Sequence, residues 1–279
     1  MKVTIQGTSS SSGLPTYMCT CEACTRAFED GMRRRQSMTL FEVNGASYLV
    51  DCGFDPILAG VVDYYQRVDG IFLSHPHLDH MYGLYSPNWR KMRGDHIPVY
   101  HPFEQILDGD ALDIGFFKLF SHYATRQQRF DFRPIETWET VELPDVRVTC
   151  FPLRHNKEDS TYYTSAAWGY LFEDSSSQAR WVYLCDTLGM DQEVISFLSE
   201  RQIDLAIIDA TFGCEPARDG HNNFETALEI FAAIGAKQAA LTHVNHTSLG
   251  EADLEALTAL DGFDPGRIVV AADGMSWKL

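Results

Sequence analysis

Five apolar segments of this chain each run into a side chain that can bind a metal ion, and this pattern limits the possible fold more than any other feature. The segments are residues 70–74, 146–153, 180–185, 205–208 and 239–242, and the side chains after them are His75, His155, Asp186, Asp209 and His243. Helical patterns lie between the strands at about 56–67, 191–201, 224–233 and 250–260. Because layered α/β folds place their chemistry at the carboxyl ends of strands, we expect a functional site there.

The remaining periodicity completes a single domain over residues 1–279. Residues 3–6 form a first strand, and residues 39–43 and 47–51 form a hairpin whose Asn44-Gly45 pair suits a tight turn. Residues 103–140 are rich in aromatic and charged side chains but have weak periodicity. We therefore interpret that stretch as an insertion or lid and not as a second domain.

The charge of the chain constrains its partners. There are 22 Lys and Arg against 39 Asp and Glu, a net charge of −17, which argues against extended nucleic acid as a partner. A small phosphorylated substrate is still compatible with this negative charge, because bound metal ions dominate the local electric field inside a metal site. The chain has no apolar run long enough for a membrane span and no signal-peptide pattern at its start, which favours a cytoplasmic protein. A homodimer is left open.

The motif His-Pro-His-Leu-Asp-His occupies residues 75–80, directly after a strand. An isolated histidine is more often structural, but four ligand-type side chains within six residues would need several buried polar groups satisfied without a metal. Imidazole and carboxylate together suit zinc, manganese or iron. One ion needs three or four protein ligands, so the motif must recruit others, and the available side chains are His155, Asp186 and His243.

A second candidate metal site lies near the start of the chain. Cys19, Cys21 and Cys24 fall within six residues, and in a reducing compartment such clustering favours a metal over disulfides. Three thiolates need a fourth ligand to close a tetrahedral structural zinc site, and His246 follows His243 by three residues. The alternative is a loop with free cysteines and an exposed histidine. We expect a small zinc-binding loop over about residues 13–37.

The order and spacing of these residues resemble the metallo-β-lactamase superfamily over almost the whole chain. The resemblance implies a four-layer αββα sandwich of the α/β class. It implies that one ion is held by His75, His77 and His155, and the other by Asp79, His80 and His243. Asp186 would bridge the two ions. Asp51 would hold the ligand loop in place without binding an ion itself.

With the cysteine cluster included, the sequence resembles the PhnP subfamily of phosphoribosyl cyclic phosphodiesterases. The matching stretches are residues 7–15, 152–156, 185–187, 241–243 and 273–275. The resemblance implies hydrolysis of 5-phosphoribosyl 1,2-cyclic phosphate in phosphonate metabolism, with manganese favoured at the active site. It also implies that His221 helps to protonate the leaving oxygen. The segment 156–168 is longer than in that subfamily, and residues 103–140 show no match.

We therefore expect an enzyme with two divalent active-site ions and one structural zinc. Its substrate would be that compound or a related cyclic nucleotide or sugar phosphate, and Asp186 and His221 would be its catalytic residues. Asp209 is interpreted as a structural residue or as one that holds the site in place without binding an ion. Two alternatives stay open. One is another hydrolase of the same fold, such as a nuclease, a lactonase or a β-lactamase, and the other is a metal-stabilised binding or carrier protein.

Overall fold

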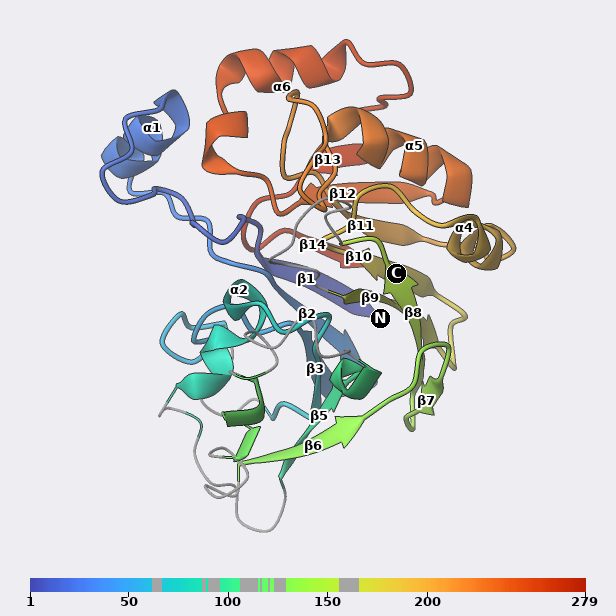
Figure 1. Ribbon diagram of the computed structural model, residues 1–279. Coiled ribbons are helices and arrows are strands. Elements are labelled where there is room, and N and C mark those ends of the chain that lie inside the picture. Colours follow the sequence, from blue (N-terminus) through green and yellow to red (C-terminus); the bar gives the residue numbers. More distant parts are fainter. Residues whose placement is uncertain are drawn as a thin grey trace.

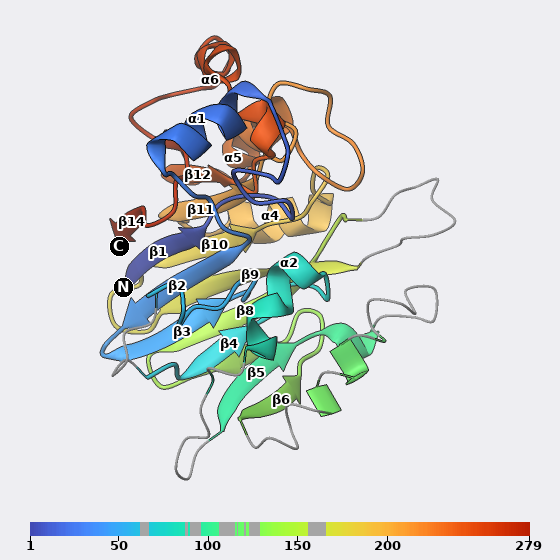
Figure 2. The ribbon, with the colours of Figure 1, turned by 90° about the vertical axis from the view of Figure 1, so that its left-hand side faces the viewer.

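The protein is described here by a computed structural model, which covers residues 1–61, 67–86, 89, 96–105, 115, 117–119, 121–122, 129–155 and 166–279. Within these residues the strands form two seven-stranded mixed sheets that pack face to face (Figures 1 and 2). The first sheet has the order β14 (Ser276–Lys278), β1 (Lys2–Gly7), β2 (Met38–Val43), β3 (Ala46–Val50), β4 (Gly70–Phe72), β5 (Ile97–His101) and β6 (Phe130–Pro134). The second has the order β13 (Ile268–Val270), β12 (Gln238–Thr242), β11 (Leu205–Asp209), β10 (Arg180–Leu184), β9 (Ala167–Asp174), β8 (Val146–Leu153) and β7 (Thr140–Glu142).

Helices flank both sheets, so the predicted α/β sandwich is confirmed. Helices α4 (Gln192–Ser199) and α5 (Phe224–Ile234) pack on the outer face of the second sheet, and α6 (Glu251–Thr258) lies beyond them next to α1 (Glu22–Asp30) (Figure 2). The first sheet carries α2 (Leu78–Met81) with the short 3₁₀ helices η1 (Tyr82–Tyr85) and η2 (Phe103–Gln105). A further 3₁₀ helix, η4 (His246–Ser248), follows β12.

The helix expected at 56–67 is not seen in its described part. Residues 56–60 form turns instead, and residues 62–66 lie outside the described part of the chain. Asp55 caps the start of this turn, because its carboxylate accepts hydrogen bonds from the backbone N–H groups of Ile57 and Leu58, both at 2.9 Å. The turn ends at Gly60, whose φ of 68° is the left-handed conformation that commonly terminates a helix.

Large aromatic side chains fill the space between the two sheets. Phe172 and Trp181 stack with ring centroids 4.2 Å apart, and Phe41 from the opposite sheet lies 4.7 Å from Phe172. All three are fully buried. Each such side chain contributes roughly 1.5–3 kcal/mol by leaving water, so this aromatic layer is a major source of stability.

The sheet topology brings the chemically important strand ends together. The pairs β3–β4, β10–β11 and β11–β12 are parallel, so the carboxyl ends of these strands meet at one edge. The predicted hairpin joins β2 to β3, with Val43 opposite Ala46. Its turn residues Asn44 and Gly45 have φ angles of 47° and 87°, as a type I′ turn requires.

The region expected to form a lid, 103–140, is described only in part. Its end supplies β6 and the first residue of β7 to the two sheets, whereas 106–114, 116, 120 and 123–128 lie outside the described residues. A lid formed by those residues stays a prediction. Residues 156–165 of the long loop 156–168 also lie outside the description. No helix in the described part of the chain is long and apolar enough to cross a membrane.

Candidate dinuclear metal site and cysteine cluster

Three residues that follow strand ends have the left-handed backbone conformation. Asp51 after β3, Asp186 after β10 and His243 after β12 have φ angles of 57°, 60° and 59°. Non-glycine residues rarely adopt this conformation, and it concentrates at functional sites where the surrounding structure imposes it. Each strand therefore turns sharply at its last residues, and this turn directs the polar side chain into the site.

The first group of candidate ligands gathers around one oxygen of Asp186. Oδ2 of this carboxylate lies 3.4 Å from Nε2 of His75 and 3.6 Å from Nε2 of His155. Nδ1 of His77 lies 2.8 Å from the same nitrogen of His75 and 3.4 Å from that of His155. The loop between β4 and α2 thus supplies two imidazoles, and the end of β8 supplies the third.

The second group gathers around the other oxygen of Asp186. Oδ1 lies 3.3 Å from Nε2 of His80 and 3.4 Å from Nε2 of His243. Oδ2 of Asp79 lies 3.6 Å from the His80 nitrogen and 3.3 Å from the His243 nitrogen. Asp186 therefore faces both groups, one with each oxygen.

These distances fit bound ions. Tetrahedral zinc with Zn–N and Zn–O bonds of about 2.0–2.2 Å places its ligand atoms roughly 3.4 Å apart. Nε2 of His80 is buried and has no hydrogen-bond partner among the described residues. A buried nitrogen without a partner is costly, so this atom is best explained as a metal ligand.

Hydrogen bonds behind the ligands fix which imidazole nitrogen faces the site. Nδ1 of His80 donates to Asp51 at 2.6 Å, Nδ1 of His155 to the Gly220 carbonyl at 3.0 Å, and Nδ1 of His243 to Thr211 Oγ1 at 2.8 Å. In each ring Nε2 is then left as the atom that can bind a metal.

Several ligands of the metal-free protein already have the charge state that binds metal, whereas His80 must lose a proton. Burial works to lower the pKa of His80, but the carboxylates around it outweigh burial and hold this pKa well above its usual value. Burial lowers the pKa of His75 well below its usual value and that of His155 to about 4, so both rings are neutral. Burial works to raise the pKa of Asp186, but His243, His80 and His75 outweigh it and hold this pKa well below its usual value. Neutral imidazole and ionised carboxylate are the forms that bind metal ions.

His221 lies at the edge of the site. Its Nδ1 donates to Oδ2 of Asp209 at 2.8 Å, and its Nε2 lies 3.9 Å from Oδ2 of Asp186. Burial works to lower the pKa of His221, but Asp209 and Asp186 raise it to about 9. Gly220 has a φ of 79°, and a Cβ there would lie 2.6 Å from the His155 carbonyl oxygen, so this turn requires glycine.

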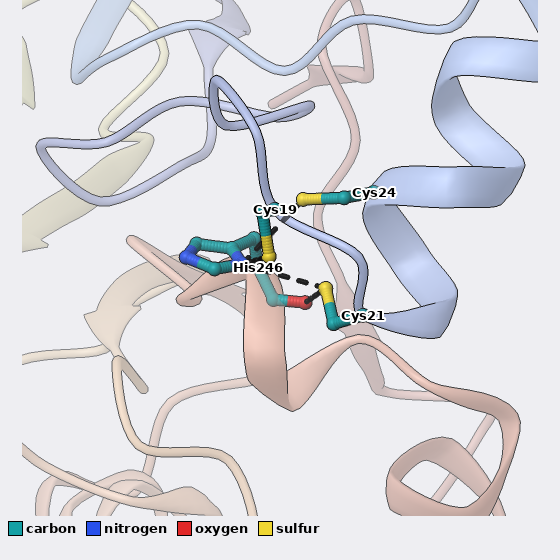
Figure 3. Close-up of side chains that lie close together, drawn as sticks. All are labelled: Cys19, Cys21, Cys24 and His246. Carbon is teal, nitrogen blue, oxygen red and sulfur yellow. Dashed lines mark hydrogen bonds between the residues drawn. The ribbon is translucent and has the colours of Figure 1, made fainter.

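Cys19, Cys21, Cys24 and His246 form the second cluster (Figure 3). Nδ1 of His246 lies 3.5 Å from each of the three sulfur atoms. Tetrahedral zinc with Zn–S near 2.3 Å and Zn–N near 2.0 Å would place sulfur and nitrogen roughly 3.5 Å apart. Cys21 is the residue that precedes α1 and Cys24 lies in its first turn, so the start of one helix positions two of the three sulfur atoms. The four side chains can therefore hold a metal ion together.

Sequence reasoning missed three hydroxyl groups that hold the site. The Tyr183 hydroxyl donates to Asp51 Oδ2 at 2.8 Å, Ser74 donates to the same oxygen at 2.8 Å, and Thr211 donates to Asp209. Ser74 directly precedes His75 and Thr211 follows Asp209 by two residues, and a search for hydroxyl groups at strand ends would have found them. Tyr183 is fully inside β10, and its sequence context predicts only a core residue.

Comparison with known proteins gives the family context. The family model described as the beta-lactamase superfamily domain matches residues 47–244. The structure is similar to a new diphosphatase from the PhnP family, with a TM-score of 0.75, 21% identity and coverage of 99% of this chain and 96% of that one. It is also similar to Zn²⁺-bound PqqB from Methylobacterium extorquens, with a TM-score of 0.78, 18% identity and full coverage of both chains.

Two further proteins are similar, one with lower identity over the whole chain and the other over a short segment only. The short form of human tRNase Z aligns with a TM-score of 0.69 and 16% identity, covering 100% of this chain and 99% of that one. An octanoyltransferase from Porphyromonas gingivalis is 30% identical over 88 residues. That match spans 30% of this chain and only 17% of the octanoyltransferase.

Proposed function

This chain belongs to the beta-lactamase superfamily, and from that premise we propose that it is a dinuclear metal-dependent hydrolase of small cyclic phosphodiesters. The observation that carries the proposal is the position of Asp186. Its two oxygens face two separate groups of ligand atoms at 3.3–3.6 Å. A carboxylate shared in this way implies two neighbouring ions, the arrangement used for hydrolysis of phosphate esters.

The ligands divide between the two ions as follows. His75, His77 and His155 would hold one ion, Asp79, His80 and His243 the other, and Asp186 both. When bound, two such ions lower the pKa of a water molecule and stabilise negative charge on phosphate oxygens. The donor set suits zinc, manganese or iron, and the cysteine cluster suits one structural zinc.

His221 is proposed as the general acid of this reaction. Because Asp209 accepts from Nδ1, the ring is held with Nε2 directed toward Asp186. Nε2 can therefore carry the proton that the leaving oxygen needs when its bond to phosphorus breaks. A general acid placed in this way contributes roughly 10²–10⁴-fold to the rate.

The finer substrate assignment rests on resemblance and charge. The cysteine cluster together with the ligand motif supports a relation to the PhnP subfamily, which favours 5-phosphoribosyl 1,2-cyclic phosphate or a related cyclic nucleotide or sugar phosphate. The net charge of −17 weighs against a long nucleic acid. On this basis the protein would act in the cytoplasm, in phosphonate metabolism or a related salvage reaction.

Substitution of Asp186 tests the proposal. Asp186→Ala should abolish hydrolysis while the folded protein keeps the zinc bound by its cysteines, measured as metal content per chain and by circular dichroism. The matched control is Asp131→Ala, which removes an exposed carboxylate on β6 and should leave activity unchanged. If Asp186→Ala hydrolyses phosphodiesters as fast as the wild type, the dinuclear assignment is wrong.

The substrate class is tested with a panel of purified compounds. It should include ribosyl 1,2-cyclic phosphate, a 2′,3′-cyclic nucleotide, a nitrophenyl diester, a dinucleoside diphosphate, a short RNA and a lactone. Cyclic diesters should give the highest kcat/KM. Turnover of the lactone alone would indicate a lactonase, turnover of the RNA alone a nuclease, and turnover of the diphosphate alone a diphosphatase. Each of these results would contradict the assignment to small cyclic phosphodiesters. Turnover of none of these compounds by fully metal-loaded protein would favour a binding or carrier protein.

A further inference from the structure

A cavity of about 320 Å³ opens beside Asp79, on the side of the metal site that faces the N-terminal loop. Its lining comes from four separate parts of the chain and consists of Ser11, Gln36, Gly53, Leu78, Asp79 and Tyr82. Gly53 allows α2 to approach closely, since a Cβ there would lie 2.0 Å from the Asp79 carbonyl oxygen. Asp79 is therefore shared between the lining of this cavity and the candidate metal ligands.

Two of the lining residues expose apolar surface. Tyr82 is 61% exposed and Leu78 is 48% exposed, although most large hydrophobic residues of the described chain are buried. Tyr82 follows α2 directly, three residues after Asp79, and its ring stacks on that of Tyr85 with centroids 6.2 Å apart. The ring is therefore supported on one side, and its exposed surface is open to a ligand in the cavity beside Asp79.

The polar groups of the cavity suit an uncharged ligand. Gln36 donates from Nε2 to the Ser11 carbonyl at 3.3 Å, which holds the amide at the cavity wall. Among the described residues that line the cavity there is no Lys, Arg or His, while Asp79 adds a negative charge. A second phosphate group would find no cation here, whereas a flat neutral ring would find an aromatic face and amide and hydroxyl groups.

We infer that this cavity binds the nucleobase of a cyclic nucleotide, with Tyr82 stacked on the base. This inference rests on the proposed phosphodiesterase function and deepens it, because it chooses nucleoside cyclic phosphates over cyclic sugar phosphates that carry a second phosphate. Stacking of a base on an aromatic side chain changes binding by roughly 5- to 100-fold. The scissile phosphate would lie at the metal ligands, and the base would lie over Tyr82.

A comparison of two substrates with the same reacting ring tests this inference. Adenosine 2′,3′-cyclic phosphate and ribose 2,3-cyclic phosphate differ only by the base. The wild type should prefer the adenosine compound in kcat/KM by roughly tenfold. Tyr82→Ala should reduce this ratio to near one through a higher KM for the adenosine compound, and Tyr82→Phe should keep most of it. The control is Phe28→Ala, which removes a 74% exposed aromatic ring on α1, away from the cavity, and should leave the ratio as in the wild type.

Direct binding separates failure of this inference from failure of the proposed function. Saturation-transfer NMR of adenosine, which has no phosphate, should show contact in the wild type and a loss of contact in Tyr82→Ala. Equal kcat/KM for both cyclic phosphates would overturn the cavity assignment and leave the phosphodiesterase intact. If neither compound is hydrolysed, the phosphodiesterase fails, and absence of the adenosine signal would then overturn the cavity assignment independently.

Discussion

Oδ2 of Asp51 lies 2.6 Å from Nδ1 of His80, and both side chains are completely buried. The carboxylate also accepts hydrogen bonds from the Ser74 backbone, the Ser74 hydroxyl and the Tyr183 hydroxyl, each at 2.8 Å. With four donors around one carboxylate, Asp51 cannot rotate without breaking several bonds in a region that excludes water. The orientation of His80 toward the metal site is therefore built into the core of the protein.

Replacing Asp51 should weaken metal binding without direct loss of a ligand. Asp51→Asn removes the charge that holds the Nδ1 proton of His80 and puts an amide donor where four donors already converge. We expect a 10- to 100-fold loss of metal affinity at the His80 position, measured by titration of the metal-free protein. Tyr183→Phe removes one donor only and should cost less. Equal metal affinity in Asp51→Asn and the wild type would contradict the orienting role.

The cysteine cluster should bind its zinc independently of the active-site ions. Cys24→Ser removes one of three sulfur atoms that lie 3.5 Å from His246, so the protein should lose one zinc per chain after dialysis against a weak chelator. Its thermal unfolding midpoint should fall, because bound metal stabilises only the folded loop. The control is Cys214→Ser, since Cys214 is an exposed cysteine outside the cluster. Unchanged zinc content in Cys24→Ser would show that the cluster is not a zinc site.

The role of His221 depends on how good the leaving group is. His221→Gln should lower kcat by roughly 10²–10⁴-fold for a cyclic ribose phosphate, whose alkoxide must be protonated as it leaves. The same substitution should change hydrolysis of a nitrophenyl diester much less, because nitrophenolate needs no proton. A side chain that only shapes the site would slow both substrates equally. Asp209→Asn weakens the 2.8 Å contact to Nδ1 of His221. It should also lower kcat more for the cyclic ribose phosphate than for the nitrophenyl diester, but by a smaller factor than His221→Gln.

Much of the site could be predicted because each ligand follows an apolar strand, and a polar side chain at that position has few structural reasons to be there. His155, Asp186 and His243 are far apart in sequence but meet because their strands run in the same direction in one sheet. The Asn44-Gly45 turn was predictable because few residues tolerate positive φ at both positions.

Other parts of the site had no local signal. Tyr183 is one of several aromatic residues in apolar strands, and only the packing of the two sheets places its hydroxyl next to Asp51. The cavity beside Asp79 needs Ser11, Gln36 and Tyr82 at once, and these belong to segments that are not neighbours in the sequence. The segment 56–60 forms a single turn that ends at Gly60 in the left-handed conformation, whereas the apolar pattern alone favours a longer helix.

Asp174 should make stability depend on pH at a position remote from the metals. Burial works to raise the pKa of this carboxyl, but hydrogen bonds from Ser176 and Ser177 outweigh it and hold the pKa well below its usual value. A carboxyl whose pKa is depressed by folding stabilises the protein above the pKa of the unfolded chain, about 3.9, and loses this contribution as the pH falls further.

Asp174→Asn should therefore lower the free energy of unfolding by about 1–3 kcal/mol at pH 7, as expected for hydrogen bonds to a charged group. The difference from the wild type should shrink as the pH falls from 4 toward 3, because the carboxyl of the unfolded wild-type chain then binds a proton while that of the folded protein stays ionised. Urea unfolding at several pH values measures this difference. Asp131→Asn, on an exposed surface, should change stability by less than about 0.5 kcal/mol. A difference for Asp174→Asn that stays constant down to pH 3 would mean that shape, and not charge, makes this residue stabilising.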